Sequence, residues 1–349
     1  MNAQIVMILG QDGITNGAIY ALLAVAILLV FSVTRVLFIP LGEFVVYGAL
    51  TLAAMQAGQP LKVIWLLAVV SVLSVAADVW ANAQRRKVSQ ARWRISKMGL
   101  FNLIYPFALA LLLSKLPLAT LPLVLQIVLT LAIVVPFGPH LYRLVYQPIA
   151  EASVLILMIV SIALHLALVG LALFIFGPDG SRISPFLDFS LQWGAVNLSS
   201  QAMLIVGMSL LLMIVIHQLF ERTVYGKALR AVAFNRLGAR LMGISPVFTG
   251  KATFFVAALI ATLSGIVIAP VTTLYFDSGF LISLKGFVGA IIGGLISYPI
   301  AAIGAVVVGL IESFAAFWAS PYKEIIVFTL IIPVLLWRSL KHSHLDEEE

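Results

Sequence analysis

The sequence contains no cysteine and few charged residues. Asp, Glu, Lys and Arg together make up 10% of the 349 residues, against about 25% in an ordinary soluble domain. The lack of cysteine excludes disulfides, cysteine-ligated zinc and thiol catalysis. The scarcity of charge and a hydrophobic fraction of 62% exclude a soluble globular protein. They predict an all-α polytopic membrane protein.

The sequence also lacks the motifs of common catalytic sites. It has no HExxH, no GxSxG and no pair of carboxylates at helical spacing within an apolar run. Gly250-Lys251 does not belong to a phosphate-binding loop, because Ser245 stands where that loop needs glycine and Ala252 where it needs Ser or Thr. We therefore expect that the chain is not an enzyme and that it holds no catalytic residues, metal or cofactor of its own.

Apolar runs near the length of a membrane span occur throughout the chain. They predict eleven segments, at residues 14–33, 36–56, 62–81, 100–116, 118–141, 154–176, 201–220, 248–269, 284–298, 300–318 and 324–337. The run 284–298 would rise only about 22 Å as a helix, against a hydrocarbon core near 30 Å. We therefore expect about 9–11 membrane segments, some short or broken, within a single transmembrane domain over 1–349.

The basic residues predict the orientation. If the loop 221–247 is cytoplasmic, five of the 21 Lys and Arg lie outside, namely Lys62, Lys115, Arg182, Lys285 and Lys323, which leaves 16 inside. This distribution follows the positive-inside rule, with the N-terminus outside and the C-terminus in the cytoplasm. The rule also explains the net charge of +7, so we do not expect nucleic-acid binding.

Two carboxylates stand inside apolar runs, where a charge is costly and is often functional. Glu43 follows Pro40 and Gly42, which predict a broken helix, and Glu312 lies in the tenth run. Each is either a buried carboxyl hydrogen-bonded within the protein or part of a transport path. His165, also mid-span, is expected to be a packing residue rather than a metal ligand.

Small and aromatic residues near the ninth run complete the candidate path. Gly289 and Gly293 form a GxxxG pattern, for which close helix packing is the favoured interpretation and ligand contact the alternative. The candidate residues of the substrate path are Gly42, Glu43, Tyr47, Phe276, Phe287, Gly293, Gly294 and Glu312.

The loop 221–247 combines arginines with many small and apolar residues. Topogenic charge accounts for the arginines but not for the apolar residues. The pattern predicts a short helix that docks into a partner protein.

This loop resembles that of the LivH-like permeases of bacterial branched-chain amino-acid ABC transporters. The matching residues are Gly226, Ala228, Arg230, Ala231, Ala233, Asn235, Ala239, Leu241, Gly243 and Ile244. Similar motifs are Asp12-Gly13-Ile14 to Leu22, Gly42-Glu43, Tyr146-Gln147-Pro148, Lys285-Gly286-Phe287, Gly293-Gly294 and Gly309 to Glu312. The resemblance covers about residues 10–57 and 118–340, and 61–117 is interpreted as an extra helical hairpin with a basic cytoplasmic loop.

The resemblance implies an importer in the bacterial inner membrane, of which this chain forms half of the translocation path. Its implied partners are two ATPase subunits that bind ATP and Mg, a second M-type permease or a second copy of this chain, membrane lipid, and a periplasmic substrate-binding protein. The loop 221–247 would be the coupling helix, through Gly226, Arg230, Ala231, Asn235, Ala239 and Gly243.

Two departures bear on the substrate. Phe38 to Leu41 replaces a polar N-F-A-H of the family, and Phe234 replaces an acidic residue. The implied cargo is therefore a branched-chain amino acid or a related apolar or aromatic carboxylate or amide. The alternative function is an ATP-independent secondary transporter or channel, which would need a buried ion pair or proton relay.

Overall fold

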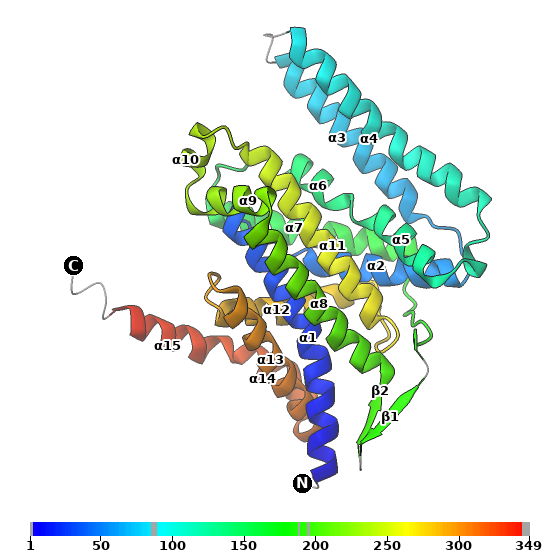
Figure 1. Cartoon of the computed structure of the whole chain (residues 1–349), viewed down its shortest axis with the longest axis vertical. Coiled ribbons are helices and arrows are strands. Elements are labelled where there is room, and N and C mark those ends of the chain that lie inside the picture. Colours follow the sequence, from blue (N-terminus) through cyan, green and yellow to red (C-terminus); the bar gives the residue numbers. More distant parts are fainter. Residues whose placement is uncertain (1–2, 85–88, 188, 194–195, 344–349) are drawn as a thin grey trace.

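The computed structural model describes residues 3–84, 89–187, 189–193 and 196–343, and it is a bundle of helices (Figure 1). The helices are α1 (Ala3–Thr34), α2 (Leu41–Gln56), α3 (Val63–Gln84), α4 (Ser89–Lys115), α5 (Leu123–Val134), α6 (Phe137–Leu141), α7 (Val154–Phe176), α8 (Ser200–Arg222), α9 (Val224–Phe234), α10 (Arg236–Leu241), α11 (Pro246–Ile268), α12 (Ser278–Ile292), α13 (Tyr298–Trp318), α14 (Lys323–Thr329) and α15 (Ile331–Ser343). Short 3₁₀ turns at Leu118–Thr120 and Ser320–Tyr322 and a π-helical turn at Tyr142–Tyr146 complete the helical elements.

In the part of the chain that the structure describes, seven helical segments are long and apolar enough to cross a membrane. Three shorter apolar helices, at Leu41–Gln56, Gly99–Lys115 and Ser278–Ile292, accompany them. This confirms an all-α polytopic membrane protein. A small antiparallel hairpin of β1 (Ser190–Trp193) and β2 (Val196–Ser199) lies in the connection between α7 and α8.

The sequence places α3, α7, α8, α11 and α13 within a few residues and misplaces other boundaries. Helices α1 and α4 begin at Ala3 and Ser89, each eleven residues before the predicted start, and the segment predicted at 118–141 is divided between α5 and α6. The segment predicted at 284–298 is α12, six residues earlier. The boundary was wrong because Lys285 was assigned to an outside loop, whereas it is buried in mid-helix. The last predicted segment is divided between α14 and α15, where Pro333 cannot donate the backbone hydrogen bond that a continuous helix needs.

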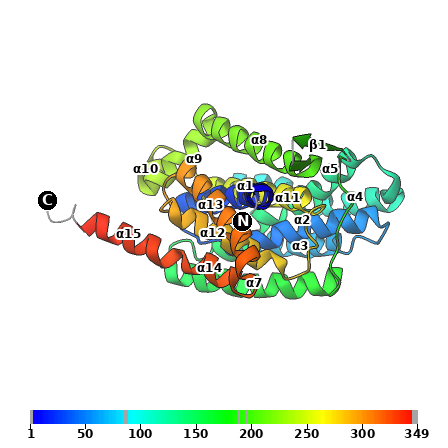
Figure 2. The same ribbon diagram turned by 90° about the horizontal axis from the view of Figure 1, so that it is seen from below.

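Helix α1 occupies the centre of the bundle, with α11, α12 and α13 around it (Figure 2). Its side chains from Ala18 to Val30 are all buried. A helix that is apolar on every side is stable only when other helices or lipid surround it. Helix α13 runs antiparallel to α1: Ser313 donates to the Leu9 carbonyl at one end (2.8 Å), and Tyr298 is hydrogen-bonded to Ser32 at the other (3.2 Å).

Helices α3 and α4 pack on each other beside this bundle and extend past it (Figure 1). The hydroxyl of Tyr105 on α4 donates to the Ala132 carbonyl on α5 (2.7 Å). Asp78 on α3 forms an ion pair with Arg143 of the π-helical turn. The basic residues Arg85, Arg86 and Lys87, predicted to form a cytoplasmic loop here, lie outside the described residues.

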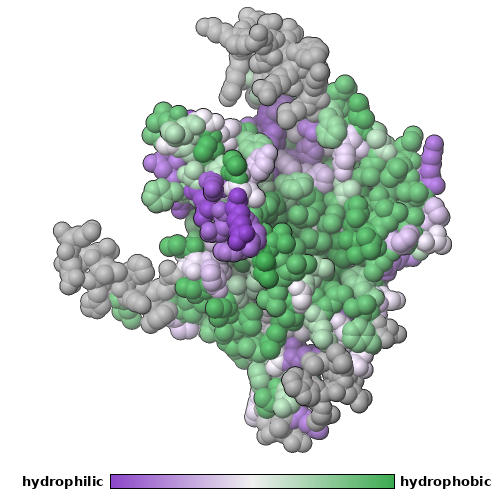
Figure 3. Space-filling model, viewed as in Figure 1, coloured by the Kyte–Doolittle hydropathy of each residue, from purple (hydrophilic) through white to green (hydrophobic). Residues whose placement is uncertain are grey.

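Polar residues gather at the two ends of the bundle. One end carries α9 and α10, and the other carries the start of α1 and the β hairpin (Figure 1). Apolar surface covers the broad region between the two ends in this view (Figure 3). Such a band is what a hydrocarbon layer requires of the protein that crosses it.

Candidate functional site

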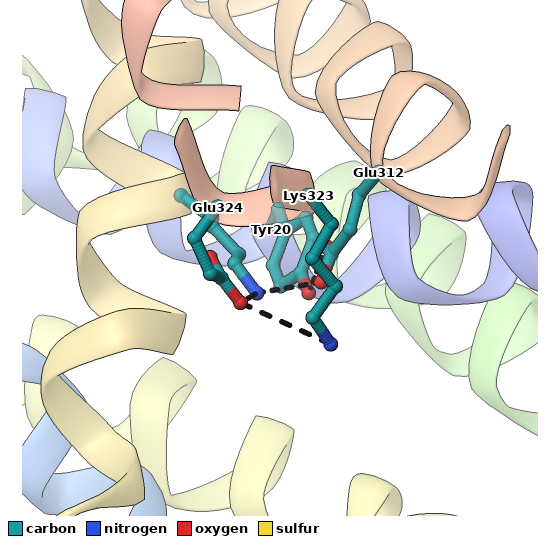
Figure 4. Close-up of polar contacts among 5 residues, drawn as sticks. Tyr20, Glu312, Lys323 and Glu324 are labelled. Carbon is teal, nitrogen blue, oxygen red and sulfur yellow. Dashed lines mark hydrogen bonds and ion pairs between the residues drawn. The ribbon is translucent and has the colours of Figure 1, made fainter. Parts of the chain in front are cut away.

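The Glu312 carboxylate on α13 is buried and belongs to a chain of four charged groups that reaches the partly exposed Glu324 and Lys323 (Figure 4). One oxygen accepts from the Lys285 ammonium on α12 at 2.6 Å, and the other accepts from the Tyr20 hydroxyl on α1 at 2.7 Å. Lys285 also donates to Glu324 at the start of α14, at 3.1 Å. Glu324 lies 4.0 Å from the ammonium of Lys323. The two carboxylates and two ammoniums balance in charge, which lowers the cost of burying Glu312 and Lys285.

Close helix packing brings these groups together. A Cβ on Gly309 of α13 would lie 2.5 Å from the Gly13 carbonyl oxygen and from Cα of Gly17, both on α1. On α12, a Cβ on Gly286 would lie 2.8 Å from Cβ of Leu23. Only glycine permits such approach of two helix backbones. As a result Tyr20, Lys285 and Glu312 face one another.

The second buried carboxylate, Glu43, occupies a separate position. It lies in the first turn of α2, fully buried, and its Oε1 is 2.8 Å from Nδ1 of His165 on α7. The His165 ring stacks on Phe280 of α12, with centroids 4.8 Å apart. Oε2 of Glu43 has no hydrogen-bond partner in the described protein. His165 is thus more than a packing residue, because it is the partner of Glu43.

The structure does not bring the candidate path residues to one place. Gly42 packs against Gly279 at the start of α12, and Tyr47 donates to the Leu168 carbonyl at 3.0 Å, so both lie near Glu43. Gly293 lies at the far end of α12, where an added Cβ would come 2.6 Å from Cβ of Ala301. Gly294 follows in a turn with a φ of +66°, which favours glycine.

The two aromatic candidates also lie apart. Phe276 precedes α12, and Phe287 lies within it; both are half-buried. The glycines Gly289 and Gly293 contact α13 at Ala305 and Ala301, which is the close-packing arrangement. Phe38 is buried among Phe44, Tyr146 and Phe254. This apolar replacement therefore fills the core.

Cavity size distinguishes the two carboxylates. The space beside Glu43 and Tyr47 holds about 10 Å³, roughly the room for one water molecule. A cavity of about 460 Å³ lies beside Glu312, between the N-terminal part of α1 and the C-terminal part of α13. Small-molecule sites typically span about 300–1,000 Å³. In this conformation only the Glu312 side of these two has room for a small solute.

The candidate coupling residues form α9 and α10, at the other end of α1. Thr223 caps α9 by accepting from the Gly226 amide (3.0 Å), and Asn235 caps α10 by accepting from the Gly238 amide (2.8 Å). Such caps satisfy amides at a helix start. Gly226 lies so close to α8 that an added Cβ would be 2.2 Å from the Leu219 carbonyl oxygen.

Further contacts attach the two short helices to the body of the protein. Leu229, Val232 and Ala239 are buried, and Arg236 donates to the Ala150 carbonyl at 3.0 Å. Ala231 lies half-buried on α9, and Gly243 lies in the turn that follows α10, with a φ of +82°. Arg230 instead forms an exposed ion pair with Glu221, at 3.1 Å. These contacts hold α9 and α10 against the rest of the protein, while other side chains of the two helices remain exposed.

The two short helices also expose large apolar side chains at their end of the bundle. The exposed residues are Val224, Tyr225, Phe234, Leu237, Leu241 and Met242, and Phe234 is 95% exposed. We call them the α9–α10 patch. Large exposed apolar side chains beside charged residues on one short element indicate a candidate protein contact.

Sequence reasoning missed the partners of both buried carboxylates. Lys285 was counted as an external charge, and His165 was not linked to Glu43. Helix α12 contains no charged residue besides Lys285. The sequence around Lys285 therefore gives no sign of its partner on α13. Its position inside a 15-residue apolar helix was the available signal, since buried lysines need an acidic partner.

Comparison with known proteins agrees with this architecture. A family model described as a branched-chain amino acid transport system permease component matches residues 11–335. The permease protein BraD of a high-affinity branched-chain amino acid transport system of Pseudomonas aeruginosa is 27% identical over 236 residues, which cover 65% of this chain and 77% of BraD. LivH of Escherichia coli K12 is 28% identical over 213 residues, covering 57% and 67%.

A more distant organism provides a further relative. A probable branched-chain amino acid transport permease protein LivH of Methanocaldococcus jannaschii is 27% identical over 217 residues, covering 55% of this chain and 68% of the relative. No solved structure matches the chain significantly. The match of the family model to nearly the whole chain shows that this protein belongs to the family of permease components of branched-chain amino acid transport systems.

Proposed function

We propose that this chain is the membrane-spanning permease subunit of an ATP-driven importer of amino acids with apolar side chains. It forms one half of a translocation path, and separate ATPase subunits supply the energy. The cargo assignment draws on the relatives BraD and LivH, which are named as permeases of branched-chain amino acid transport systems. Replacement of the family's polar segment by Phe38 to Leu41 does not oppose it, because Phe38 lies in the core.

The observation that carries the proposal is the α9–α10 patch. These helices lie at one polar end of the bundle, and their buried residues fix them to the body while the patch faces outward. Burial of a large aromatic side chain in a partner's pocket is the usual anchor of a protein interface. An ATPase subunit that accepts Phe234 and its neighbours would transmit its closure through α9 to α8 and α1, which α9 contacts.

The charge distribution supports the placement of this end in the cytoplasm of a bacterial inner-membrane protein. Arg222, Lys227, Arg230, Arg236 and Arg240 all lie in or beside α9 and α10. Positive-inside orientation then places the start of α1 and the β hairpin on the periplasmic side. A periplasmic binding protein would deliver cargo there, and a second permease subunit, of the M type or a copy of this chain, would complete the path.

The test is purification of the tagged chain in mild detergent from its own cells, with identification of the proteins that accompany it. We expect ATPase subunits and a second permease, and we expect Phe234→Ala to release the ATPases. Phe174→Ala is the matched control, because Phe174 is also strongly exposed, at the opposite end of the protein. A wild-type chain that purifies without any ATPase contradicts the proposal.

A second candidate function, transport without ATP, is favoured by one observation. Two buried acid–base pairs, Glu43 with His165 and Glu312 with Lys285, lie within the described helices, and proton or ion relays use such pairs. Uptake by liposomes that contain this chain alone, driven by a proton gradient, would establish this candidate instead.

A further inference from the structure

The cavity beside Glu312 lies at the end of the bundle opposite α9 and α10. Its lining residues recur at helical spacing on two antiparallel helices, with additions from the connection before α12 and from α14. They are Leu9, Asp12, Thr15 and Asn16 of α1, Val271 and Thr272, Glu312, Ser313, Ala316 and Phe317 of α13, and Lys323. The cavity therefore presents both apolar and charged groups.

The charges of the lining residues are not equally available. Both oxygens of Glu312 are occupied, by Tyr20 and Lys285. Asp12 has no hydrogen-bond or ion-pair partner among the described residues, and the only one that Lys323 has there is Glu324, at 4.0 Å. A 4.0 Å separation is too long for a hydrogen bond. An exposed carboxylate without a protein partner and a partly exposed, weakly paired ammonium thus line the same cavity.

The remaining lining residues of the cavity include apolar ones. Leu9, Val271, Ala316 and Phe317 supply hydrocarbon surface, and about 460 Å³ is room for a small solute. A ligand that satisfies Asp12 and Lys323 together needs a cation and an anion of its own, with an apolar remainder. A free α-amino acid with an apolar side chain has these three parts.

We propose that this cavity is the entry site of the transport path and that it selects zwitterions. Asp12 binds the α-ammonium, Lys323 binds the α-carboxylate, and the apolar residues contact the side chain. The proposal rests on the proposed function and specifies its cargo: a simple carboxylate leaves Asp12 unpaired, and an amide leaves both charges unpaired. Asp12 is exposed in the free chain, and a ligand that covers it without pairing with it leaves a desolvated charge, which is costly.

The absence of cysteine permits a direct binding test. Thr272→Cys introduces a single thiol at the exposed rim of the cavity, and Ser184→Cys introduces one in an exposed loop that does not line it. The full chain is labelled in membranes with an impermeant maleimide while L-leucine is titrated. L-Leucine is expected to protect Cys at 272 and not at 184. 4-Methylpentanoate, which lacks the amine, and isoamylamine, which lacks the carboxylate, are expected to protect at least about tenfold less effectively.

Charge variants in the Thr272→Cys background assign the two contacts. Asp12→Asn and Lys323→Gln are each expected to raise the half-protecting concentration of L-leucine by about tenfold or more. Asp179→Asn and Lys62→Gln, at other exposed positions, are the matched controls and leave it unchanged. Asn16→Cys replaces Thr272→Cys as the reporter if that variant does not fold.

Each outcome decides the inference. Preferential protection by L-leucine, lost in both charge variants, supports it. Equal protection by 4-methylpentanoate, or no protection by any of the three solutes at either reporter, overturns it. The assay reads binding without ATP, so failure here, with ATPases still co-purifying, would refute the entry site and leave the proposed function standing.

Discussion

Lys285 of α12 and Glu312 of α13 are joined by a 2.6 Å ion pair inside the bundle, where both side chains are less than one-tenth exposed. Because the pair is buried, Glu312→Gln leaves the Lys285 ammonium with the partly exposed Glu324, at 3.1 Å, as its remaining acidic partner. We expect this variant to lower the free energy of unfolding by about 1.5–3 kcal/mol, the range for a lost hydrogen bond to a charged group. Glu221→Gln, which breaks the exposed pair with Arg230, is expected to cost under about 1 kcal/mol. Thermal unfolding in detergent compares the two, and equal effects would contradict the structural role of the buried pair.

Gly309 contacts the backbone of α1, so any side chain there must separate α1 from α13. We expect Gly309→Ala to lower the melting temperature and to weaken the Glu312 network that this packing positions. Gly207→Ala is the matched control, because a Cβ at Gly207 of α8 meets nothing within 4 Å. Alanine favours a helix over glycine by about 1 kcal/mol, so this control is expected to be neutral or stabilising. A melting temperature unchanged by Gly309→Ala would show that the two helices are not in this contact.

Glu43 and His165 are expected to depend on each other. His165→Phe keeps a ring against Phe280 but leaves a fully buried carboxyl without its partner. The double variant Glu43→Met with His165→Phe removes both polar groups, and we expect it to be more stable than the His165→Phe single variant. A double-mutant cycle on unfolding should give a coupling of about 1–3 kcal/mol. Strictly additive effects would contradict the contact.

Gly226 tests the contact between α8 and α9, the proposed coupling helix. A Cβ at this position would overlap the last turn of α8, so Gly226→Ala should displace α9 without disturbing the spans. We expect lower substrate-stimulated ATP hydrolysis by the assembled transporter at an unchanged melting temperature, and the same direction of change for Arg230→Ala. Gly238→Ala is the milder comparison, since its Cβ would lie 3.2 Å from the Asn235 side chain. Wild-type stimulation in Gly226→Ala would refute the coupling role.

The sequence predicts the helices better than it predicts their partners. Apolar run length alone gives α3, α7, α8, α11 and α13 within a few residues, because hydrocarbon thickness sets that length. It fails at α12, where Lys285 resembles the end of a span. A charge is compatible with mid-helix only when a partner exists, and Glu312 lies 27 residues away in the sequence.

In the candidate site too, the sequence indicates the buried carboxylates but not their partners. Glu43 and Glu312 are recognisable because a carboxylate in an apolar run is rare. Their contacts with His165 and Tyr20 span 122 and 292 residues of sequence, and no local pattern encodes such pairs. Asp12 and Lys323 escaped notice for another reason: each lies near the end of its apolar run, where a charge is ordinary, and only the antiparallel packing of α1 and α13 brings both to one cavity.

The most direct test of the central claim is uptake of labelled L-leucine and L-phenylalanine by liposomes that contain the purified transporter, with ATP supplied on the side of α9 and α10. The account predicts accumulation that requires ATP hydrolysis and that fails in Gly226→Ala. Uptake that proceeds equally without ATP, or with a nucleotide that cannot be hydrolysed, would contradict it.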